Sequence, residues 1–314
     1  MGIVSRTWTL TKVRLRLAMR NRAFFFFSLV MPMIFLFGAG GFLRHGPRQY
    51  IPYVLGAVLT TTVMGSFWGL SVQLVSFREQ GILRRFRIAP IGAGPMLASS
   101  IISNYFMAIP VVIFEIFVCR LAFQVRQWGN VWAIVLLITI GSAAFSALGL
   151  IVASVTNTMQ ETQMINNLIW MGLIFLSGAT IPIAIFPSWL QRVALFIPAQ
   201  YLATGLESAT TSMSTYSEVL EDFAALVMGL FVAFEISRRL FRWEPEAKAP
   251  RSAKLWVLAA LVPFLLFGAW ENVYGNRLKT VNSHFSRLSM IMPQQAPPQP
   301  KGSATGGAVS PLNP

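Results

Sequence analysis

The chain has 314 residues, of which 55% are hydrophobic and 11% charged, and its formal net charge at pH 7 is +14. Soluble domains carry roughly 25% charged residues, so this composition excludes an ordinary soluble protein. One cysteine excludes a disulfide framework, and two histidines leave little material for a metal centre. Apolar blocks of about 17 to 25 residues, the length of a helix that crosses a bilayer, predict an all-α, polytopic membrane protein.

These apolar blocks predict six core transmembrane helices. In chain order, the predicted spans cover residues 24–42, 51–75, 96–119, 131–155, 164–181 and 223–241. Before the first span, residues 5–22 mix Arg and Lys with apolar side chains, as in a helix that lies at the membrane surface. We therefore expect an N-terminal amphipathic interfacial helix followed by six spans.

The fourth predicted span is rich in small residues at four-residue spacing, such as Ser142 with Ser146 and Gly149 with Ala153. Small side chains let the backbones of neighbouring helices approach closely in lipid. This pattern favours tight packing within the chain over a dimer interface.

An apolar segment interrupted by prolines, residues 181–208, lies between the fifth and sixth predicted spans. Neither half is long enough to cross a bilayer. Pro187 suits the start of a helix, and Pro198 would stop or kink that helix. A re-entrant or interfacial hairpin before the sixth span fits this pattern best.

The C-terminal part of the chain contains one more apolar block, residues 255–270, which is a possible seventh span. The residues after it are rich in Pro, Gly, Gln and Ser, a composition that predicts disorder. The expected organisation is a transmembrane domain over 1–243, a linker with the possible extra helix over 244–274, and a disordered tail over 275–314.

The distribution of basic residues predicts the orientation. Sixteen Lys and Arg lie in the segments that share a side with the N-terminus, and five lie in the loops on the other side. The positive-inside rule therefore places the N-terminus in the cytoplasm, in a multi-pass protein of the plasma (inner) membrane. Because the charge is gathered in loops, it indicates topology and contact with membrane lipids, and no nucleic-acid partner is expected.

The basic segment 76–92, after the second predicted span, is the most informative part of the sequence. A short charged loop held between two spans suits the docking of a cytoplasmic partner. An ordinary basic loop that interacts with anionic lipid headgroups is the alternative. The candidate partner-coupling residues are Arg78, Glu79, Gly81, Arg84, Arg85 and Arg87.

Three features resemble the ABC-2 type permeases, the membrane subunits of ABC exporters. The basic segment contains FREQGILRRFRIAP, which resembles the family's loop after span two. The motif LSGATIP (Leu176–Pro182) is followed by FPSWL and IPAQY in the family's order. A basic N-terminal helix also precedes a Phe-rich, Pro-containing first span. The resemblance covers about residues 5–243.

The resemblance implies a homodimer of permeases bound to two cytoplasmic ABC ATPase subunits, with a pathway lined mainly by the second and fifth spans. ATP-driven movement would reach the permease through the coupling loop. The sequence contains no GxxxxGK[ST] phosphate loop. We therefore expect that the chain is not an enzyme and holds no cofactor, with ATP and Mg on the partner ATPase.

Two further sets of residues are candidates for function. Glu115 lies inside the third predicted span, where a carboxylate is costly and often functional. It is near the outer end and could reach water or Arg120, so a structural role is slightly favoured. We connect five hairpin residues to substrate exit: Pro182, Pro187, Trp189, Pro198 and Tyr201. The same residues also suit anchoring of the fold at the membrane interface.

The expected function is an exporter permease for a hydrophobic drug-like, lipid or lipid-linked substrate. The permease of a polysaccharide or glycolipid exporter would look similar at this level. An ion-coupled secondary transporter is the alternative from another class, but it should carry acidic or histidine residues in mid-span, and Glu115 is the only marginal example. A lipid-modifying enzyme would need an acid–base or metal cluster that the two isolated histidines do not supply.

Overall fold

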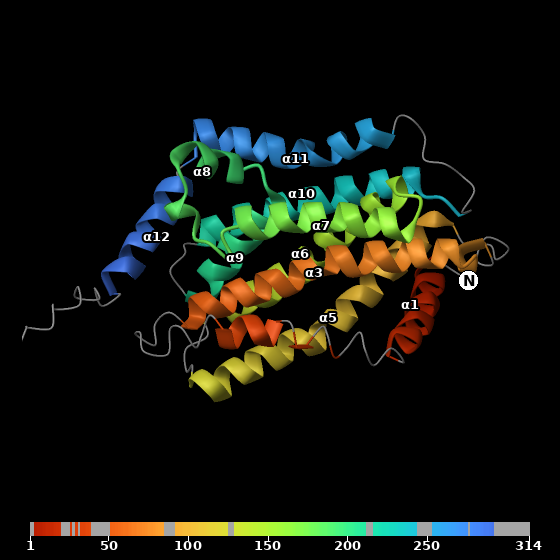
Figure 1. The fold of residues 1–314 in the computed structure, drawn as a ribbon, viewed down its shortest axis with the longest axis horizontal. Helices are drawn as coiled ribbons and strands as arrows, with labels where there is room; N and C mark the ends of the chain where they lie inside the picture. Colours follow the sequence, from red (N-terminus) through yellow and green to blue (C-terminus); the bar gives the residue numbers. More distant parts are fainter. Residues whose placement is uncertain are drawn as a thin grey trace, which may run out of the picture.

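The computed structural model is a bundle of long helices (Figure 1). It describes residues 3–19, 26, 29–30, 32–38, 51–84, 92–124, 129–211, 216–243, 253–275 and 277–291. Within these residues every regular element is a helix, which agrees with the predicted all-α class. The elements are α1 (Ile3–Met19), α3 (Ile51–Glu79), α5 (Ala93–Phe123), α6 (Val131–Val155), α7 (Met159–Leu176), η2 (Ile183–Ile185), α8 (Ser188–Ala194), α9 (Pro198–Thr211), α10 (Tyr216–Leu240), α11 (Ala253–Val273) and α12 (Arg277–Ile291).

Three helices in the described part of the chain, α3, α5 and α6, are long and apolar enough to cross a membrane. Leu258–Val273 of α11 and Arg277–Ser283 of α12 meet the same requirement together, as a pair bent by 74°. A helical protein with several membrane spans is therefore confirmed at this level. The fifth and sixth predicted spans are helical as α7 and α10. Of the first, 24–42, the structure describes residues 26, 29–30 and 32–38, which are helical, and the other positions lie outside the described residues.

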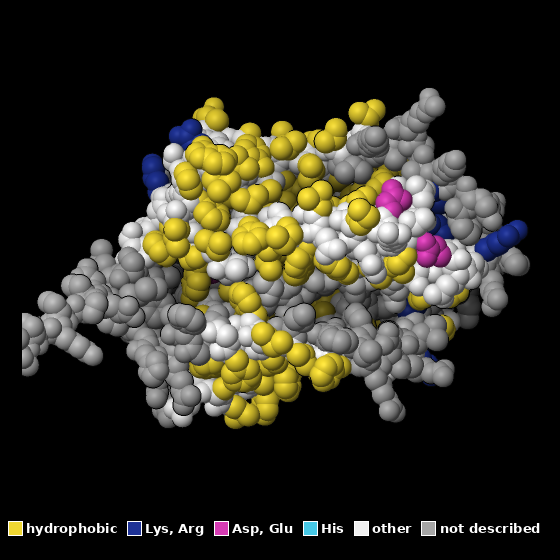
Figure 2. Space-filling view, viewed as in Figure 1, with side chains coloured by type: hydrophobic (Ala, Val, Ile, Leu, Met, Phe, Trp, Pro, Cys, Tyr) yellow, Lys and Arg dark blue, Asp and Glu magenta, His cyan; other side chains and the backbone are white. Residues whose placement is uncertain are grey.

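The long helices run between two ends of the bundle (Figure 1). At one end lies α1, where α3, α6 and α10 finish and where α5, α7 and α11 begin. At the other end lie α8, α9 and α12. We call these the α1 end and the α8 end. Figure 2 shows hydrophobic side chains over the middle of the bundle and the charged side chains towards its ends, as expected for a surface that faces lipid.

The centre of the bundle is α6, which packs against α3 and α10. The helices α6 and α3 approach closely at Gly149, where an added Cβ would lie 2.3 Å from the carbonyl oxygen of Phe67 on α3. Ser142 and Ser146 on the same helix are fully buried. The prediction that the small residues of the fourth span serve packing within the chain is confirmed.

We expect Gly149→Ala to destabilise the protein, because its new methyl group meets the backbone of α3, which cannot rotate away. Overpacking of this kind costs about 1–3 kcal/mol. The matched control is Gly172→Ala on α7, where none of the described residues lies within 4 Å of the added Cβ. Thermal unfolding in detergent should show a lower Tm for Gly149→Ala alone. Equal Tm values for the two variants would contradict the close contact between α3 and α6.

The region after α11 differs from the sequence prediction. Disorder was expected from residue 275, whereas Arg277–Ile291 form α12. Arg277 is paired with Asp222 of α10, a residue 55 positions away. Asn282 also donates to Gln191 of α8 at 3.4 Å. The prediction rested on composition, which does not register a helix that is ordered by contacts with distant parts of the chain.

Candidate functional site

The basic segment after α3 begins with a tight turn. Gly81 has φ +69°, a conformation that favours glycine, and its N–H donates to the carbonyl oxygen of Arg78 at 3.0 Å. Leu83 follows and is completely buried in the core. The start of the segment is therefore fastened to the bundle, with Glu79 and Arg84 exposed on its surface.

Arg78 lies inside the protein, whereas the sequence grouped it with residues that face a partner. It is 2% exposed, and its guanidinium donates to the carbonyl oxygens of Ala153 at 2.8 Å and Thr156 at 2.6 Å. The last carbonyls of a helix have no partner within the helix, and a cation there also interacts favourably with the helix dipole. The last turn of α3 faces α6, and Arg78 stabilises the end of α6 through these hydrogen bonds. Arg85 and Arg87 lie outside the described residues.

A second arginine, Arg242, reaches the same place from the end of α10. It donates to the carbonyl oxygen of Thr156 at 2.7 Å and to the side-chain oxygen of Asn157 at 3.0 Å. The carbonyl of Thr156 therefore accepts hydrogen bonds from both guanidinium groups. Nothing in the sequence singled out Arg242, because its partner Thr156 lies 86 positions away.

The N-terminus of α7 is capped from two directions. Thr158 accepts from the N–H of Glu161 at 3.2 Å, and Glu161 accepts from the N–H of Asn157 at 2.7 Å. This arrangement is a close variant of a capping box, and its Thr-x-x-Glu spacing is visible in the sequence. Glu79 of α3 accepts from the N–H of Met159 at 2.7 Å. Its negative charge thus lies at the positive end of the α7 dipole.

Together these contacts tie the end of α3 to the start of α7, and we call them the α3–α7 clasp. Its residues are Arg78, Glu79, Thr156, Asn157, Thr158, Glu161 and Arg242. Farther along the two helices, Asn166 donates to Ser71 at 2.7 Å in the buried interior. A movement of the segment after α3 would therefore be transmitted to α7 through bonds at its first residues and along its length.

The prolines of the predicted hairpin mark helix starts. Pro182 precedes η2, Pro187 precedes α8, and Pro198 is the first residue of α9. Proline suits these positions because its φ is already helical and its missing N–H has no helical partner there. The prediction for Pro187 is confirmed. Pro198 lies beyond the end of α8 and begins a new helix, α9, which packs against α3, α6 and α10.

The two aromatic residues of this region have different surroundings. Trp189 is 65% exposed and is available to lipid. Tyr201 is buried, its hydroxyl donates to the carbonyl oxygen of Leu195 at 2.8 Å, and the guanidinium of Arg277 lies 4.5 Å from its ring centroid. Tyr201 is therefore part of the packing between α9 and α12.

Glu115 is completely buried, so the prediction that it could reach water or Arg120 is wrong. Its Oε1 accepts from the hydroxyl of Thr62 on α3 at 2.5 Å. Its Oε2 has no hydrogen-bond partner among the described residues. The side chain points from α5 towards α3, and this direction could not be read from its distance to the end of the span.

Comparison with known proteins agrees with this architecture. Residues 5–210 match the ABC-2 type transporter family, and the chain belongs to that family of membrane transport subunits. The chain is also similar to the linearmycin resistance permease protein LnrN of Bacillus subtilis (strain 168), with 23% identity over 173 residues. That similarity covers 55% of this chain and 43% of the relative, so the match spans less than half of the relative's length. The helices α10, α11 and α12 lie beyond the family match.

Proposed function

We propose that this protein is the permease subunit of an ATP-driven exporter, powered by a separate cytoplasmic ABC ATPase. Family membership supports the class, and the α3–α7 clasp is the observation that carries the mechanism. Glu79, a member of the clasp, and Arg84 next to it are exposed and would meet the ATPase. Arg78 and Arg242 would act inside the protein by keeping the α6–α7 connection in register with α3.

In this proposal the α1 end faces the cytoplasm. The basic residues of α1, of the segment after α3 and of the end of α10 all belong to that end, in agreement with the positive-inside rule. The core would contain six spans, with the short helices η2, α8 and α9 forming the re-entrant hairpin near the outer surface. The helix α11 would be an additional span of the plasma membrane protein.

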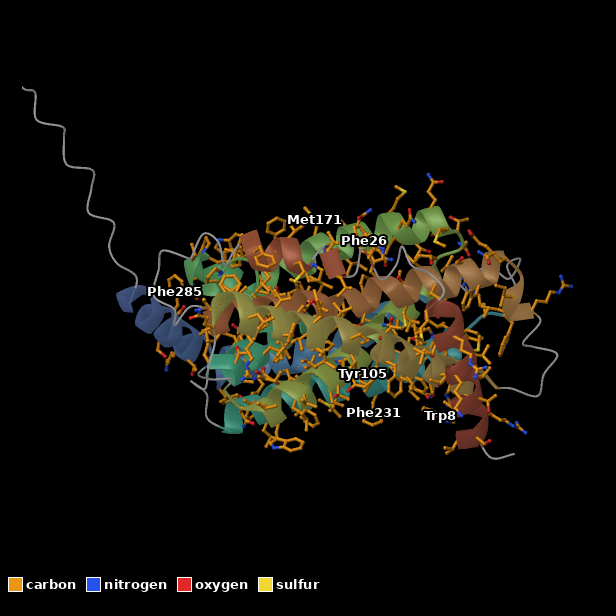
Figure 3. The ribbon with its side chains drawn as sticks, turned by 90° about the horizontal axis from the view of Figure 1, so that it is seen from below. Trp8, Phe26, Tyr105, Met171, Phe231 and Phe285 are labelled. Carbon is orange, nitrogen blue, oxygen red and sulfur yellow. The ribbon has the colours of Figure 1, made fainter. Side chains whose placement is uncertain are left out.

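The proposed substrate pathway follows a face of α7 that the chain leaves uncovered. Met164, Leu168, Met171 and Phe175 are exposed at three- and four-residue spacing, so they form one apolar stripe. Met171 lies at the outer edge of the bundle in Figure 3. A second copy facing this stripe would enclose an apolar pathway suited to a drug-like, lipid or lipid-linked molecule. The name of the similar protein, a resistance permease, supports export of such a compound.

The proposal predicts that Arg84→Ala weakens coupling without weakening the fold, because Arg84 is exposed and makes no hydrogen bond or ion pair with the described residues of the bundle. Loss of about 1 kcal/mol of interface contact should lower permease-dependent ATP hydrolysis about fivefold. The measurement uses the permease co-expressed with the ATPase encoded beside it and purified in lipid nanodiscs. Arg192→Ala is the matched control, since Arg192 is also exposed but lies on α8 at the opposite end.

A permease that binds no co-encoded ATPase would contradict this proposal. Ion-coupled transport would then be favoured, because Glu115 is a buried intramembrane carboxylate with one oxygen unpaired in the described structure. Loss of proton-gradient-driven uptake or efflux in Glu115→Gln would identify that second function.

A further inference from the structure

The helix α1 carries a buried arginine that the surrounding described residues leave without a counter-charge. Arg14 is 3% exposed. Its Nη2 lies 3.4 Å from the sulfur of Met96, and its guanidinium carbon lies 5.4 Å from the ring centroid of Phe77. Its Nε and Nη1 atoms are buried and have no hydrogen-bond partner among the described residues. The cation is thus surrounded by apolar and weakly polar groups.

This environment is unfavourable for a guanidinium. Removing a charge from water is unfavourable unless a counter-ion and hydrogen bonds compensate. A thioether is only a weak acceptor, and a cation–π contact compensates only a small part of this loss. Burial lowers the pKa of Arg14 to about 10, with no carboxylate opposing the shift. Arg14 therefore remains protonated near neutral pH and lacks an anion.

The contact with Met96 brings the guanidinium of Arg14 to the first turn of α5. This helix begins at Ala93, and Gly92 before it supplies no side-chain cap. Pro95 has no N–H, and the N–H of Met96 donates to the carbonyl oxygen of Gly92 at 3.4 Å. The N–H groups of Ala93 and Gly94 are therefore the ones without a helical acceptor, at the positive end of the helix dipole. An uncapped helix N-terminus is a ready anion site, and here the buried guanidinium lies against the same turn.

The turn carries little side-chain bulk of its own. Gly92 and Gly94 have no side chains, and among the described residues a Cβ added at Gly94 would meet only Arg238 Cδ, at 3.8 Å. Arg238 is about half exposed and already paired with Glu235 on its own helix at 2.9 Å. It therefore adds basic character beside the turn without supplying the anion that Arg14 lacks.

We propose that a phosphate group binds at the first turn of α5, between Arg14 and the uncapped helix N-terminus, and that it is the headgroup phosphate of an anionic phospholipid. A phosphate has the oxygen geometry that a guanidinium fork and helix N–H groups bind together. Such a lipid would join α1 to α5 and supply the missing negative charge.

The outer face of α1 argues for a lipid as the source of this phosphate. Trp8, Val13 and Met19 are exposed large apolar residues on this helix, next to the basic side chain of Lys12. Lys12 lies 5.6 Å from the ring centroid of Trp8. Figure 3 shows Trp8 on α1 at the edge of the bundle. Exposed aromatic and apolar residues mixed with cations are typical of a helix at the headgroup level of a bilayer.

The test is native mass spectrometry of the full-length protein in detergent, titrated separately with phosphatidylglycerol, phosphatidylcholine and inorganic phosphate. The wild-type protein should retain one tightly bound phosphatidylglycerol in preference to phosphatidylcholine. In Arg14→Gln the affinity of this site should fall about tenfold or more, the effect of losing charge-assisted hydrogen bonds. Arg16→Gln, an exposed position on the same helix, should bind the lipid as the wild type does.

Unchanged phosphatidylglycerol affinity in Arg14→Gln would overturn the proposal. Arg14-dependent binding of inorganic phosphate that equals the lipid would support the anion site and overturn the lipid source. Binding of neither probe, with Arg14-dependent capture of the ATPase instead, would overturn the proposal in favour of a carboxylate from a protein partner.

If Arg14→Gln does not fold, the wild-type protein provides the decisive measurement. A phosphatidylglycerol with a photoreactive headgroup should label peptides from residues 3–19 and 92–100. Competition by unlabelled phosphatidylglycerol, but not by phosphatidylcholine, should remove this labelling. Labelling confined to other helices would overturn the site.

Discussion

Arg78→Met is expected to lower the free energy of unfolding by about 3 kcal/mol or more, although the sequence predicts a surface loop at Arg78. The substitution removes two charge-assisted hydrogen bonds, each worth about 1.5–3 kcal/mol. It also leaves the carbonyls of Ala153 and Thr156 with fewer donors in the interior. The α6–α7 connection would then lose one of the two guanidinium groups that hold it. Coupling to the ATPase should therefore decrease together with stability.

Thermal unfolding in detergent and limited proteolysis between α6 and α7 would measure this effect. Arg78→Lys should fall between the wild type and Arg78→Met, because an ammonium restores the charge but cannot reproduce the two-pronged geometry. Arg84→Met, at an exposed position of the same segment, should keep the wild-type Tm. A stable Arg78→Met protein that hydrolyses ATP with its partner normally would refute the bracing role.

Arg277→Ala is expected to lower the free energy of unfolding by about 3–5 kcal/mol, because it leaves the carboxylate of Asp222 buried without its counter-charge. The side chains of this ion pair are only 9% and 4% exposed. Arg277 also donates to the hydroxyl of Thr204 at 2.6 Å and lies over the ring of Tyr201. One substitution therefore removes the contacts that hold α12 to both α9 and α10.

A double-mutant cycle with Asp222→Asn and Arg277→Gln would measure the coupling between the two residues. The double variant should be more stable than Arg277→Gln alone, because no unpaired charge remains buried. Arg192→Ala, exposed at the same end of the bundle, should leave unfolding unchanged. Additive effects in the cycle would mean that the two side chains do not act as a pair.

Much of the fold was predictable because apolar length is a strong constraint in a bilayer. The fourth span was predicted at 131–155, and α6 covers Val131–Val155. The packing role of Gly149 was also predictable, since small residues at regular spacing have one common use between helices. The ends of α3 and α7 differ from their predicted spans by a turn or more, because capping contacts and not hydropathy set them.

The candidate site was only partly predictable. Exposure and burial depend on which side of a helix faces its neighbour. The side chains of Arg78 and Glu115 both point towards a neighbouring helix, so both are buried. Both residues were identified, but their surroundings were not, because loop membership and distance along a span carry no information on direction. Arg242, Asp222 and Arg277 act through partners far away in the chain, which no local pattern reports. The Thr158-x-x-Glu161 cap was the exception, since all its members are neighbours in sequence.

The shared carbonyl of Thr156 has a mechanical consequence. A carbonyl oxygen has two lone pairs, and in this structure one accepts from Arg78 and the other from Arg242. If either guanidinium moves away, a lone pair of this carbonyl oxygen loses its hydrogen bond in the interior. The ends of α3 and α10 are therefore both held at the same residue, Thr156. A displacement applied at this end would therefore move α3 and α10 together, and α7 would follow them.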